Sequence, residues 1–275
     1  MTEAAYKHAV AQALEYIRAG DIYQLNLAQR FTVPWNDGAA SLYCRLRQAS
    51  PAAYGAFLGS KLVNDRHSIC SVSPELFLKV RGREVVTCPI KGTRPRGETP
   101  AQTVAAAREL GSCAKERAEL NMIVDVERND LGRVCEYGSV RVRSSGEIQE
   151  LPTLLHRVAT VSGTLRKHCG PATLLKAVFP GGSITGAPKI RAMEIIRELE
   201  AAPRGPYCGA VGWLGINGDM ELNIAIRTAL VDSKSGVAHF HAGSGIVADS
   251  NPEREYEETL HKARAFFSAT SATLD

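Results

Sequence analysis

A β-hairpin pattern in the middle of the chain constrains the fold more than any other feature. In SPELFLKVRGREVVTCPI, residues 73–90, apolar side chains first alternate along the chain, at Leu76, Leu78 and Val80. Gly82 then supplies a turn, and Val85–Cys88 forms a second β-prone run. Because the strands of a hairpin pair in antiparallel order, the sheet around this stretch is expected to be largely antiparallel.

Helical and strand patterns alternate along the rest of the chain. Helices are predicted over residues 1–20, 39–48, 103–131 with a break near Gly111, 172–179, 190–200 and 252–267. Strands are predicted over residues 21–33, 53–58, 68–72, 140–142, near 165, 208–216, 220–231 and 238–246. No repeat or linker interrupts this order. We therefore expect one α+β domain over residues 1–275, with largely antiparallel sheets layered with helices.

The charge, the cysteines and the N-terminus argue against several kinds of protein. A net charge of +4 is too small to indicate nucleic-acid binding, although it suits a small anionic substrate. The seven cysteines include no CxxC pair and no Cys/His cluster, which argues against a zinc site or a disulfide framework. The N-terminus has no signal-peptide pattern and no long apolar run. We therefore expect a cytoplasmic protein that does not bind membranes.

Two predicted helices each carry a pair of glutamates three residues apart. The pairs are Glu116/Glu119 in KERAELNMIVD and Glu255/Glu258 in NPEREYEETLHKA. Residues at this spacing share a helix face, and carboxylates from two helices can hold a hard divalent cation such as Mg²⁺. Glutamate pairs on surfaces and acids near a helix N-terminus are also common without a metal, so the spacing leaves both interpretations open.

Two glycine-rich stretches are candidate anion sites. FPGGSITGAPK lacks the adjacent Gly-Lys-Ser/Thr of a phosphate-binding loop, but it is a turn that opens a helix, with Ser183 and Thr185 free to bind an anion. AGSGIV places Gly243 and Gly245 where the backbone can approach a ligand or another strand. Tight structural turns are an equally good explanation of such stretches.

Three single residues are further candidates. Arg227 interrupts an apolar strand pattern, and a buried arginine needs a carboxylate partner from the protein or from a ligand. His156 is explained by a structural hydrogen bond unless a substrate lies beside it. In PIKGTRPR, Lys91 lies close to Arg94 and Arg96. It is a solvated cation, a partner for an anionic substrate, or a nucleophile.

Five segments together resemble the family of chorismate-utilising enzymes. They extend from Gly20 to Ala263 and are GDIYQLNLAQRF, SPELF followed by PIKGTRPRG, AELNMIVDVERNDLGRV, GGSITGAPK and GSGIVADSNPEREYEETLHKA. The resemblance implies the fold of that family, with the active site between its sheets, chorismate as the substrate and Mg²⁺ as the cofactor.

The resemblance also implies which residues bind metal and substrate. Glu119 and Glu258 would hold Mg²⁺, with Glu116 and Glu255 as further ligands, and the metal would bind the ring carboxylate of chorismate. The residues implied to bind the substrate, including both of its carboxylates, are Gly92, Thr93, Thr185, Gly186, Tyr207, Arg227, Gly243 and Gly245.

Lys91 separates the branches of the family. Anthranilate synthases have alanine at this position, whereas lysine is typical of aminodeoxychorismate synthases. Water-using branches have a lysine base at the position of Gln24, and glutamine cannot replace it. We therefore expect Lys91 to attack C2 of chorismate while Glu75 protonates the departing C4 hydroxyl, with His156 near the reacting carbons. The neighbouring arginines or the metal are expected to lower the pKa of Lys91.

Ammonia would then add at C4 and expel Lys91, giving 4-amino-4-deoxychorismate for p-aminobenzoate and folate synthesis. The alternatives are conversion of chorismate to anthranilate and pyruvate, and a chorismate-binding domain without catalysis. The additional N-terminal region of the family is expected to be absent. No Cys/His arrangement resembles an amidotransferase, which implies a separate glutamine amidotransferase subunit that supplies ammonia. The sequence leaves the oligomeric state open.

Overall fold

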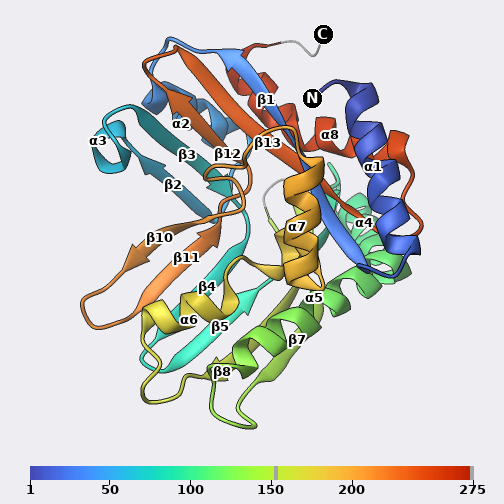
Figure 1. Ribbon diagram of the computed structural model, residues 1–275, viewed down its shortest axis with the longest axis vertical. Coiled ribbons are helices and arrows are strands. Elements are labelled where there is room, and N and C mark those ends of the chain that lie inside the picture. Colours follow the sequence, from blue (N-terminus) through green and yellow to red (C-terminus); the bar gives the residue numbers. More distant parts are fainter. Residues whose placement is uncertain (152–153, 273–275) are drawn as a thin grey trace. The chain divides into compact units, whose positions relative to one another are not determined.

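A computed structural model describes residues 1–151 and 154–272, which form two compact units (Figure 1). Unit 1 comprises residues 1–74, 184–211 and the chain from residue 223, and unit 2 comprises residues 75–183 and 212–222. The predicted α+β class is confirmed, since the pairs β1–β13 and β12–β13 of one sheet and β4–β5 and β5–β8 of the other are antiparallel. The expectation of a single domain stays a prediction.

Unit 1 is built on a six-stranded sheet in the order β2-β3-β12-β13-β1-β9. Its strands are β1 (Gln24–Pro34), β2 (Tyr54–Leu58), β3 (His67–Ser73), β9 (Gly186–Ala187), β12 (Thr228–Asp232) and β13 (Val237–Ile246). Strands β1 and β13 pair from Leu25↔Ile246 to Pro34↔Val237. The start of β1 carries Gln24 and Asn26 and is called the polar stretch of β1. The long central pair places this stretch directly beside the glycine-rich end of β13, which carries Gly243 and Gly245.

Helices of unit 1 cover one face of this central pair, except that the short helix Ser60–Val63 lies beside β3. They are α1 (Glu3–Arg18), α2 (Ala39–Ala49), α3 (Ser60–Val63), α7 (Lys189–Leu199) and α8 (Pro252–Thr270). Leu25 and Leu27 of β1 pack with α1 and α7, and Phe240 of β13 stacks on Phe266 of α8. Because side chains alternate along a strand, the opposite face of β1 carries buried polar residues such as Asn26.

Unit 2 contains most of a seven-stranded sheet in the order β10-β11-β4-β5-β8-β6, with β7 paired to β8. Its strands are β4 (Leu76–Arg81), β5 (Glu84–Cys88), β6 (Ile90–Pro95), β7 (Arg141–Glu150), β8 (Leu154–Thr164), β10 (Ala210–Leu214) and β11 (Met220–Ile224). Its helices are α4 (Pro100–Ser112), α5 (Ala114–Gly132) and α6 (Pro171–Val178). The predicted hairpin is confirmed as β4 and β5, with Gly82 at φ +58° in the turn.

Two predicted elements are each divided in the structure. The predicted break near Gly111 is confirmed, since the helix predicted over residues 103–131 is two helices that meet at Cys113. The predicted strand over residues 220–231 is wrong, because β11 and β12 belong to different sheets. The chain turns between them at Arg227, whose φ is +48°. Arg227 therefore lies at a bend of the chain and not inside an apolar strand.

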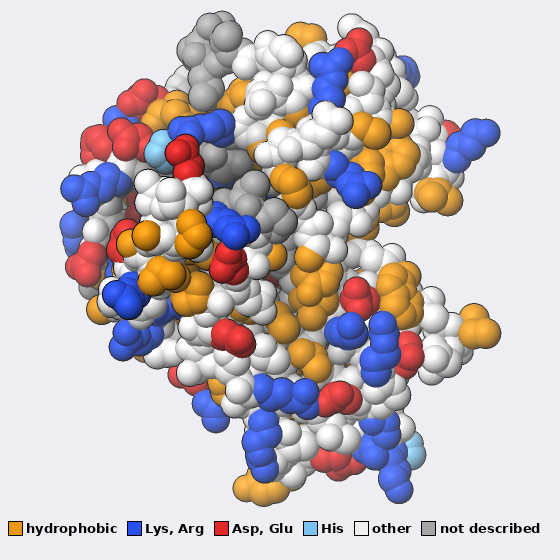
Figure 2. All heavy atoms as spheres, turned by 180° about the vertical axis from the view of Figure 1, so that it is seen from behind, with side chains coloured by type: hydrophobic (Ala, Val, Ile, Leu, Met, Phe, Trp, Pro, Cys, Tyr) orange, Lys and Arg blue, Asp and Glu red, His pale blue; other side chains and the backbone are white. Residues whose placement is uncertain are grey.

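The cysteines, the helices and the surface charges can each be compared with the composition. All seven cysteines are free thiols. Among the described helices, none combines the length and apolar character needed to cross a membrane. On the face drawn in Figure 2, lysine and arginine side chains are interspersed with acidic ones.

Candidate active site

Lys91 and Gly92 lie at an irregularity in strand β6 of unit 2. The pairing of β6 with β8 shifts its register between Ile90 and Thr93. Gly92 has φ +92°, a conformation that favours glycine. A bulge of this kind redirects the side chains of its strand. The PIKGT sequence therefore removes Lys91, which is half-buried, from the regular alternation of the sheet.

Helices α4 and α5 crowd this bulge. A Cβ atom at Gly92 would lie 2.8 Å from Oε2 of Glu116 and 2.8 Å from Cδ1 of Leu110. Glycine is thus required at this position by its conformation and by the space available. The end of α4 and the start of α5 fix the backbone beside Lys91.

His156 lies across from the bulge on β8. Its Nδ1 is 2.9 Å from Oγ1 of Thr93, and the two residues are directly paired in the sheet. The imidazole is buried. The structure therefore brings together two of the predicted site residues, and the Thr93 hydroxyl fixes the orientation of the His156 ring.

Glu75 precedes β4 and is only 4% exposed. Oγ of Ser183 donates a hydrogen bond of 2.6 Å to Oε1 of Glu75. The expectation that Ser183 is free to bind an anion is wrong, because its hydroxyl is engaged by this carboxylate. The bond joins two sequence motifs, SPELF and GGSITGAPK, within unit 2.

The two arginines that follow Lys91 are held by carboxylates. Arg94 contacts Glu109 and Glu116, each at 2.9 Å, and Arg96 lies 2.8 Å from Glu150. Paired charges exert a weaker field on their surroundings than free ones. The geometry therefore gives little support to the idea that these arginines favour the neutral form of Lys91.

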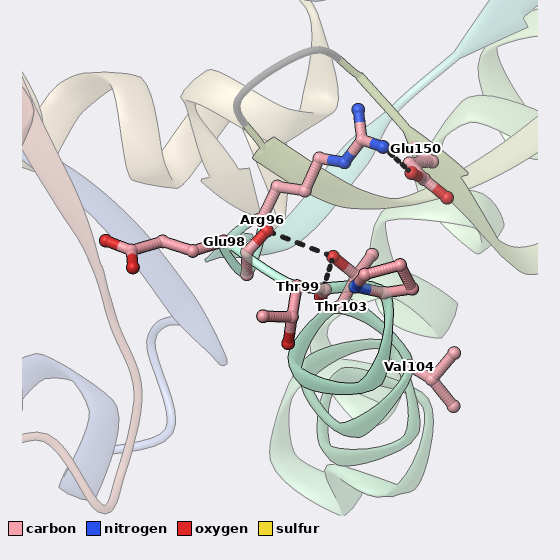
Figure 3. A pocket seen from close by; sticks show the side chains of 8 residues that line it. Arg96, Glu98, Thr99, Thr103, Val104 and Glu150 are labelled. Carbon is pink, nitrogen blue, oxygen red and sulfur yellow. Dashed lines mark hydrogen bonds and ion pairs between the residues drawn. The ribbon is translucent and has the colours of Figure 1, made fainter.

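A hollow of about 530 Å³ lies at the start of α4, and several of its polar groups bind one another (Figure 3). Arg96 pairs with Glu150 across it, and Oγ1 of Thr103 donates to the backbone carbonyls of Gly97 and Thr99. Thr99 also caps the helix. The hollow contains none of the predicted site residues.

The first glutamate pair lies near the start of α5. Oε1 of Glu116 accepts the bond from Arg94, while its buried Oε2 has no hydrogen-bond partner. Glu119 is half-buried one turn further along. An unsatisfied carboxylate oxygen is the donor type that a hard divalent cation requires, so this pair fits Mg²⁺ chemically.

The second glutamate pair lies on α8 in unit 1. Oε1 of Glu255 accepts a hydrogen bond of 2.6 Å from Oγ of Ser250, and Glu258 pairs with Lys262 at 2.7 Å. Within residues 1–151 and 154–272, no group of three or more His, Cys, Asp or Glu side chains is gathered as metal ligands. The predicted Mg²⁺ site therefore stays a prediction.

The GGSITGAPK stretch forms a short 3₁₀ turn (Gly182–Ile184), strand β9 and the start of α7. Asn26 N donates 2.7 Å to the carbonyl of Thr185. A Cβ atom at Gly186 would lie 2.2 Å from the carbonyl of Gln24, so glycine permits this close pairing with β1. The predicted residues Thr185 and Gly186 are thus held against the polar stretch of β1.

Tyr207 is a buried aromatic residue in the loop that precedes β10. Its ring stacks on His241 of β13, with centroids 5.2 Å apart and an interplanar angle of 13°. Burial raises the pKa of Tyr207 well above its usual value. Burial, with the charges of Arg30 and Arg204, lowers the pKa of His241 to about 4. At neutral pH both rings are therefore uncharged.

Arg227 is the strongest anion-binding candidate in unit 1. Its Nη1 donates a hydrogen bond of 3.2 Å to Oγ of Ser50, and among the described residues no carboxylate lies within ion-pair distance. Burial lowers its pKa, although an arginine remains charged at neutral pH. A half-buried guanidinium without a carboxylate partner is suited to bind the carboxylate of a ligand.

Gly243 and Gly245 lie on β13 beside the polar stretch of β1. A Cβ atom at Gly243 would lie 2.6 Å from the carbonyl of Leu27, so the neighbouring strand already requires glycine there. The carbonyl of Gly243 accepts a bond of 2.8 Å from Nζ of Lys262. The sequence leaves open whether the backbone of AGSGIV approaches a ligand or another strand. At Gly243 the close approach of another strand is confirmed.

Three residues near the predicted site were not predicted in these roles. Ser183 holds Glu75, His241 stacks on Tyr207, and Arg204 lies over the Tyr207 ring at 5.7 Å. A hydroxyl in a glycine-rich turn is a signal for Ser183. Nothing local marks His241 or Arg204, since their contacts depend on the fold.

Comparisons with known proteins place the chain among described enzymes. A family described as chorismate binding enzyme matches residues 1–268. Anthranilate synthase component 1 of Streptomyces coelicolor is 45% identical over 269 residues, which cover 98% of this chain and 52% of that protein. Aminodeoxychorismate synthase component 1 of Bacillus subtilis is 44% identical over 264 residues, covering 96% and 55%.

The solved structures agree with the sequence relatives. The crystal structure of anthranilate synthase component I from Streptococcus pneumoniae matches with a TM-score of 0.87 and 37% identity, covering 98% of this chain and 58% of that one. The chain thus spans about half the length of the relatives it matches. Relatives with two different products are similar to it to almost the same degree.

Proposed function

Because the chain belongs to the family of chorismate-binding enzymes, we propose that it converts chorismate and ammonia to 4-amino-4-deoxychorismate and water. The single observation that carries this choice is Lys91 at the bulge of β6. A side chain redirected by a bulge and half-buried beside the Thr93–His156 pair is suited to a nucleophile. The product feeds p-aminobenzoate and folate synthesis.

The proposed reaction uses Lys91 twice. Its neutral amine forms a bond to C2 of chorismate, the ring double bonds shift, and the C4–oxygen bond breaks as Glu75 gives a proton to the leaving hydroxyl. Ammonia then bonds to C4, the double bonds shift back, and the C2–nitrogen bond breaks. The proton that the Lys91 amine loses on bonding to C2 balances the one that Glu75 gives to the leaving water, and the proton lost by ammonia balances the one that Lys91 regains. Ser183 supports this role by fixing the Glu75 carboxylate.

The remaining residues bind the substrate. Arg227, which lacks a carboxylate partner among the described residues, is proposed to bind the enolpyruvyl carboxylate, and Tyr207 is proposed to bind the same group. Mg²⁺, held by Glu119 and Glu258 with help from Glu116 and Glu255, would neutralise the ring carboxylate. A separate glutamine amidotransferase is proposed to supply ammonia.

Conversion of chorismate to anthranilate and pyruvate is the second candidate, because anthranilate synthases are among the relatives at 45% and 46% identity, close to the 44% of an aminodeoxychorismate synthase. The two reactions differ in whether the enolpyruvyl group is retained. A Lys91 nucleophile favours the first.

A product assay tests the choice. The purified chain is incubated with chorismate, Mg²⁺ and ammonium, and the products are separated by mass spectrometry. We expect aminodeoxychorismate without pyruvate, and a loss of at least about 100-fold in Lys91→Ala. Lys167→Ala, at an exposed turn of unit 2, is the matched control. Anthranilate with pyruvate, or full activity of Lys91→Ala, would contradict the proposal.

A further inference from the structure

A buried ion pair joins three segments of unit 1 around the predicted substrate residues. Nε of Arg204 lies 2.9 Å from Oε2 of Glu200, and Nη2 lies 2.6 Å from Oε1. The side chains are only 14% and 5% exposed, so this is not an ordinary surface pair. Oε1 of Glu200 also accepts a hydrogen bond of 2.9 Å from the backbone N–H of Ala28 in β1.

The guanidinium of Arg204 extends this connection to the GGSITGAPK segment. Its Nη1 donates 2.9 Å to the carbonyl of Ile184, and its Nη2 donates 2.6 Å to the carbonyl of Asn26. Ile184 directly precedes Thr185, whose own carbonyl accepts from Asn26 N at 2.7 Å. One side chain therefore fixes the spacing between β1 and the turn that carries Thr185.

Arg204 also contacts Tyr207. The guanidinium carbon lies 5.7 Å from the centroid of the Tyr207 ring, and His241 stacks on that ring at 5.2 Å. The next residue, Cys208, is held at φ +64° while its N–H donates 3.0 Å to the carbonyl of Ala225. The Tyr207 ring is thus fixed by its neighbours and by the backbone on both sides.

We propose that Arg204 is a positioning residue for chorismate binding, which acts by holding Thr185 and Tyr207 in place. The inference rests on the proposed function, because it assigns those two residues to the substrate. Only a planar group with several fixed donors can bind Glu200 and two separate carbonyls at once. A lysine at this position keeps the charge but cannot make the same set of bonds.

Arg204→Lys tests this role through the separation of KM from kcat. Thr185 and Tyr207 bind the substrate in its ground state and in its transition state alike, so their displacement weakens both equally. We expect KM for chorismate to rise about 10- to 100-fold while kcat changes less than about 3-fold. Glu200→Gln is expected to raise KM in the same direction.

Asp232→Asn is the matched control in the same unit. Asp232 is likewise only 5% exposed and binds an arginine, Arg66, through Nε at 2.7 Å. It contacts none of the proposed substrate residues. This variant is expected to lose thermal stability with KM unchanged. If Arg204→Lys behaves in the same way, Arg204 is merely structural and the proposal is wrong.

Hydrogen exchange gives a readout that does not need turnover. The amides of Asn26 and Cys208 are expected to exchange at least about 10-fold faster in Arg204→Lys than in the wild type, and not in Asp232→Asn. Unchanged exchange in Arg204→Lys would overturn the positioning role. If the wild type makes no product from chorismate, the proposed function fails, while the exchange result still decides whether Arg204 holds these segments.

Discussion

At the scale of single residues, two of the four non-glycine residues with positive φ in the described chain lie at the candidate site of unit 1, while Asp65 and Ser271 lie in a bend and at a helix end. Cys208 and Arg227 have φ values of +64° and +48°, and neither is a glycine. The amide of Cys208 donates to Ala225, which brings the two segments together. Such conformations cost about 1–3 kcal/mol each and collect at functional sites. One of these residues follows Tyr207, and the other is Arg227, which has no carboxylate partner among the described residues.

Buried His241 gives the protein a pH-dependent stability. Burial and the nearby Arg30 and Arg204 lower its pKa from 6.5 to about 4, partly opposed by a hydrogen bond to the backbone of Pro203. Between these values the unfolded state binds a proton that the folded state does not, so stability is lost as the pH falls. We expect about 3 kcal/mol of unfolding free energy to be lost between pH 7 and 4 through this residue.

The measurement is urea unfolding at several pH values for the wild type and His241→Gln. The variant should lose about 3 kcal/mol less over this range, since its side chain does not titrate. His8→Gln, at an exposed position of α1, is the matched control for the substitution itself. Parallel curves for the wild type and His241→Gln would show that His241 does not cause the effect.

The sequence suggests candidate site residues, but it does not predict which partners those residues have in the folded chain. PIKGT places Thr93 two residues after Lys91, and a strand then brings it opposite His156. The bond from Ser183 to Glu75 spans 108 positions, and the pair of Arg94 with Glu116 spans 22. Such contacts depend on how the elements pack, and no local pattern records them.

At the scale of the elements, the bulge of β6 depends on the two helices packed against it, α4 and α5. The register shift, the φ of Gly92 and the contact with Glu116 occur within a few residues. A strand with regular alternation would have no such feature. The orientation of Lys91 therefore depends on the α4–α5 junction as well as on its own strand.

Gly92→Ala tests this dependence. The added methyl would meet Glu116 and Leu110 at 2.8 Å in a conformation that is already strained for alanine. We expect a loss of about 2–4 kcal/mol in unfolding free energy and of most aminodeoxychorismate formation. Thermal unfolding and the product assay measure the two effects.

Gly138→Ala is the matched control, because Gly138 has φ +70° in the same unit but open space around its Cα. It isolates the conformational cost, which is about 1 kcal/mol. If Gly92→Ala costs no more than Gly138→Ala, the helices move aside easily and do not fix the bulge.

Local patterns predict most elements, and the exceptions have a physical reason. Helices α1, α2 and α8 are found where apolar spacing and end signals place them. The apolar run over residues 220–231 contains no glycine or proline between its two strands. The bend at Arg227 arises because β11 and β12 belong to two different sheets. Local strand propensity alone therefore predicts a single strand over residues 220–231.

At the scale of the whole molecule, the chain matches about half the length of its relatives, so its activity has to be tested with the chain alone. We expect ammonium to support product formation and glutamine to fail, since no amidotransferase pattern is present in the sequence. Removal of Mg²⁺ by a chelator should lower the rate at least about 100-fold, with recovery on adding the metal back. Product from glutamine without a partner would contradict this view.

The order in which the segments of unit 1 occur has a consequence for synthesis on the ribosome. Its sheet takes strands from residues 1–74, 184–211 and 223 onward, and α8 contributes Ala263 and Phe266 to its core. During translation the first 74 residues therefore leave the exit tunnel long before the strands and the helix that cover them. In the sequence, unit 2 lies between these segments, so its hairpin and helices can fold first. Strand β1 meanwhile remains uncovered and accessible to chaperones until α8 has been made.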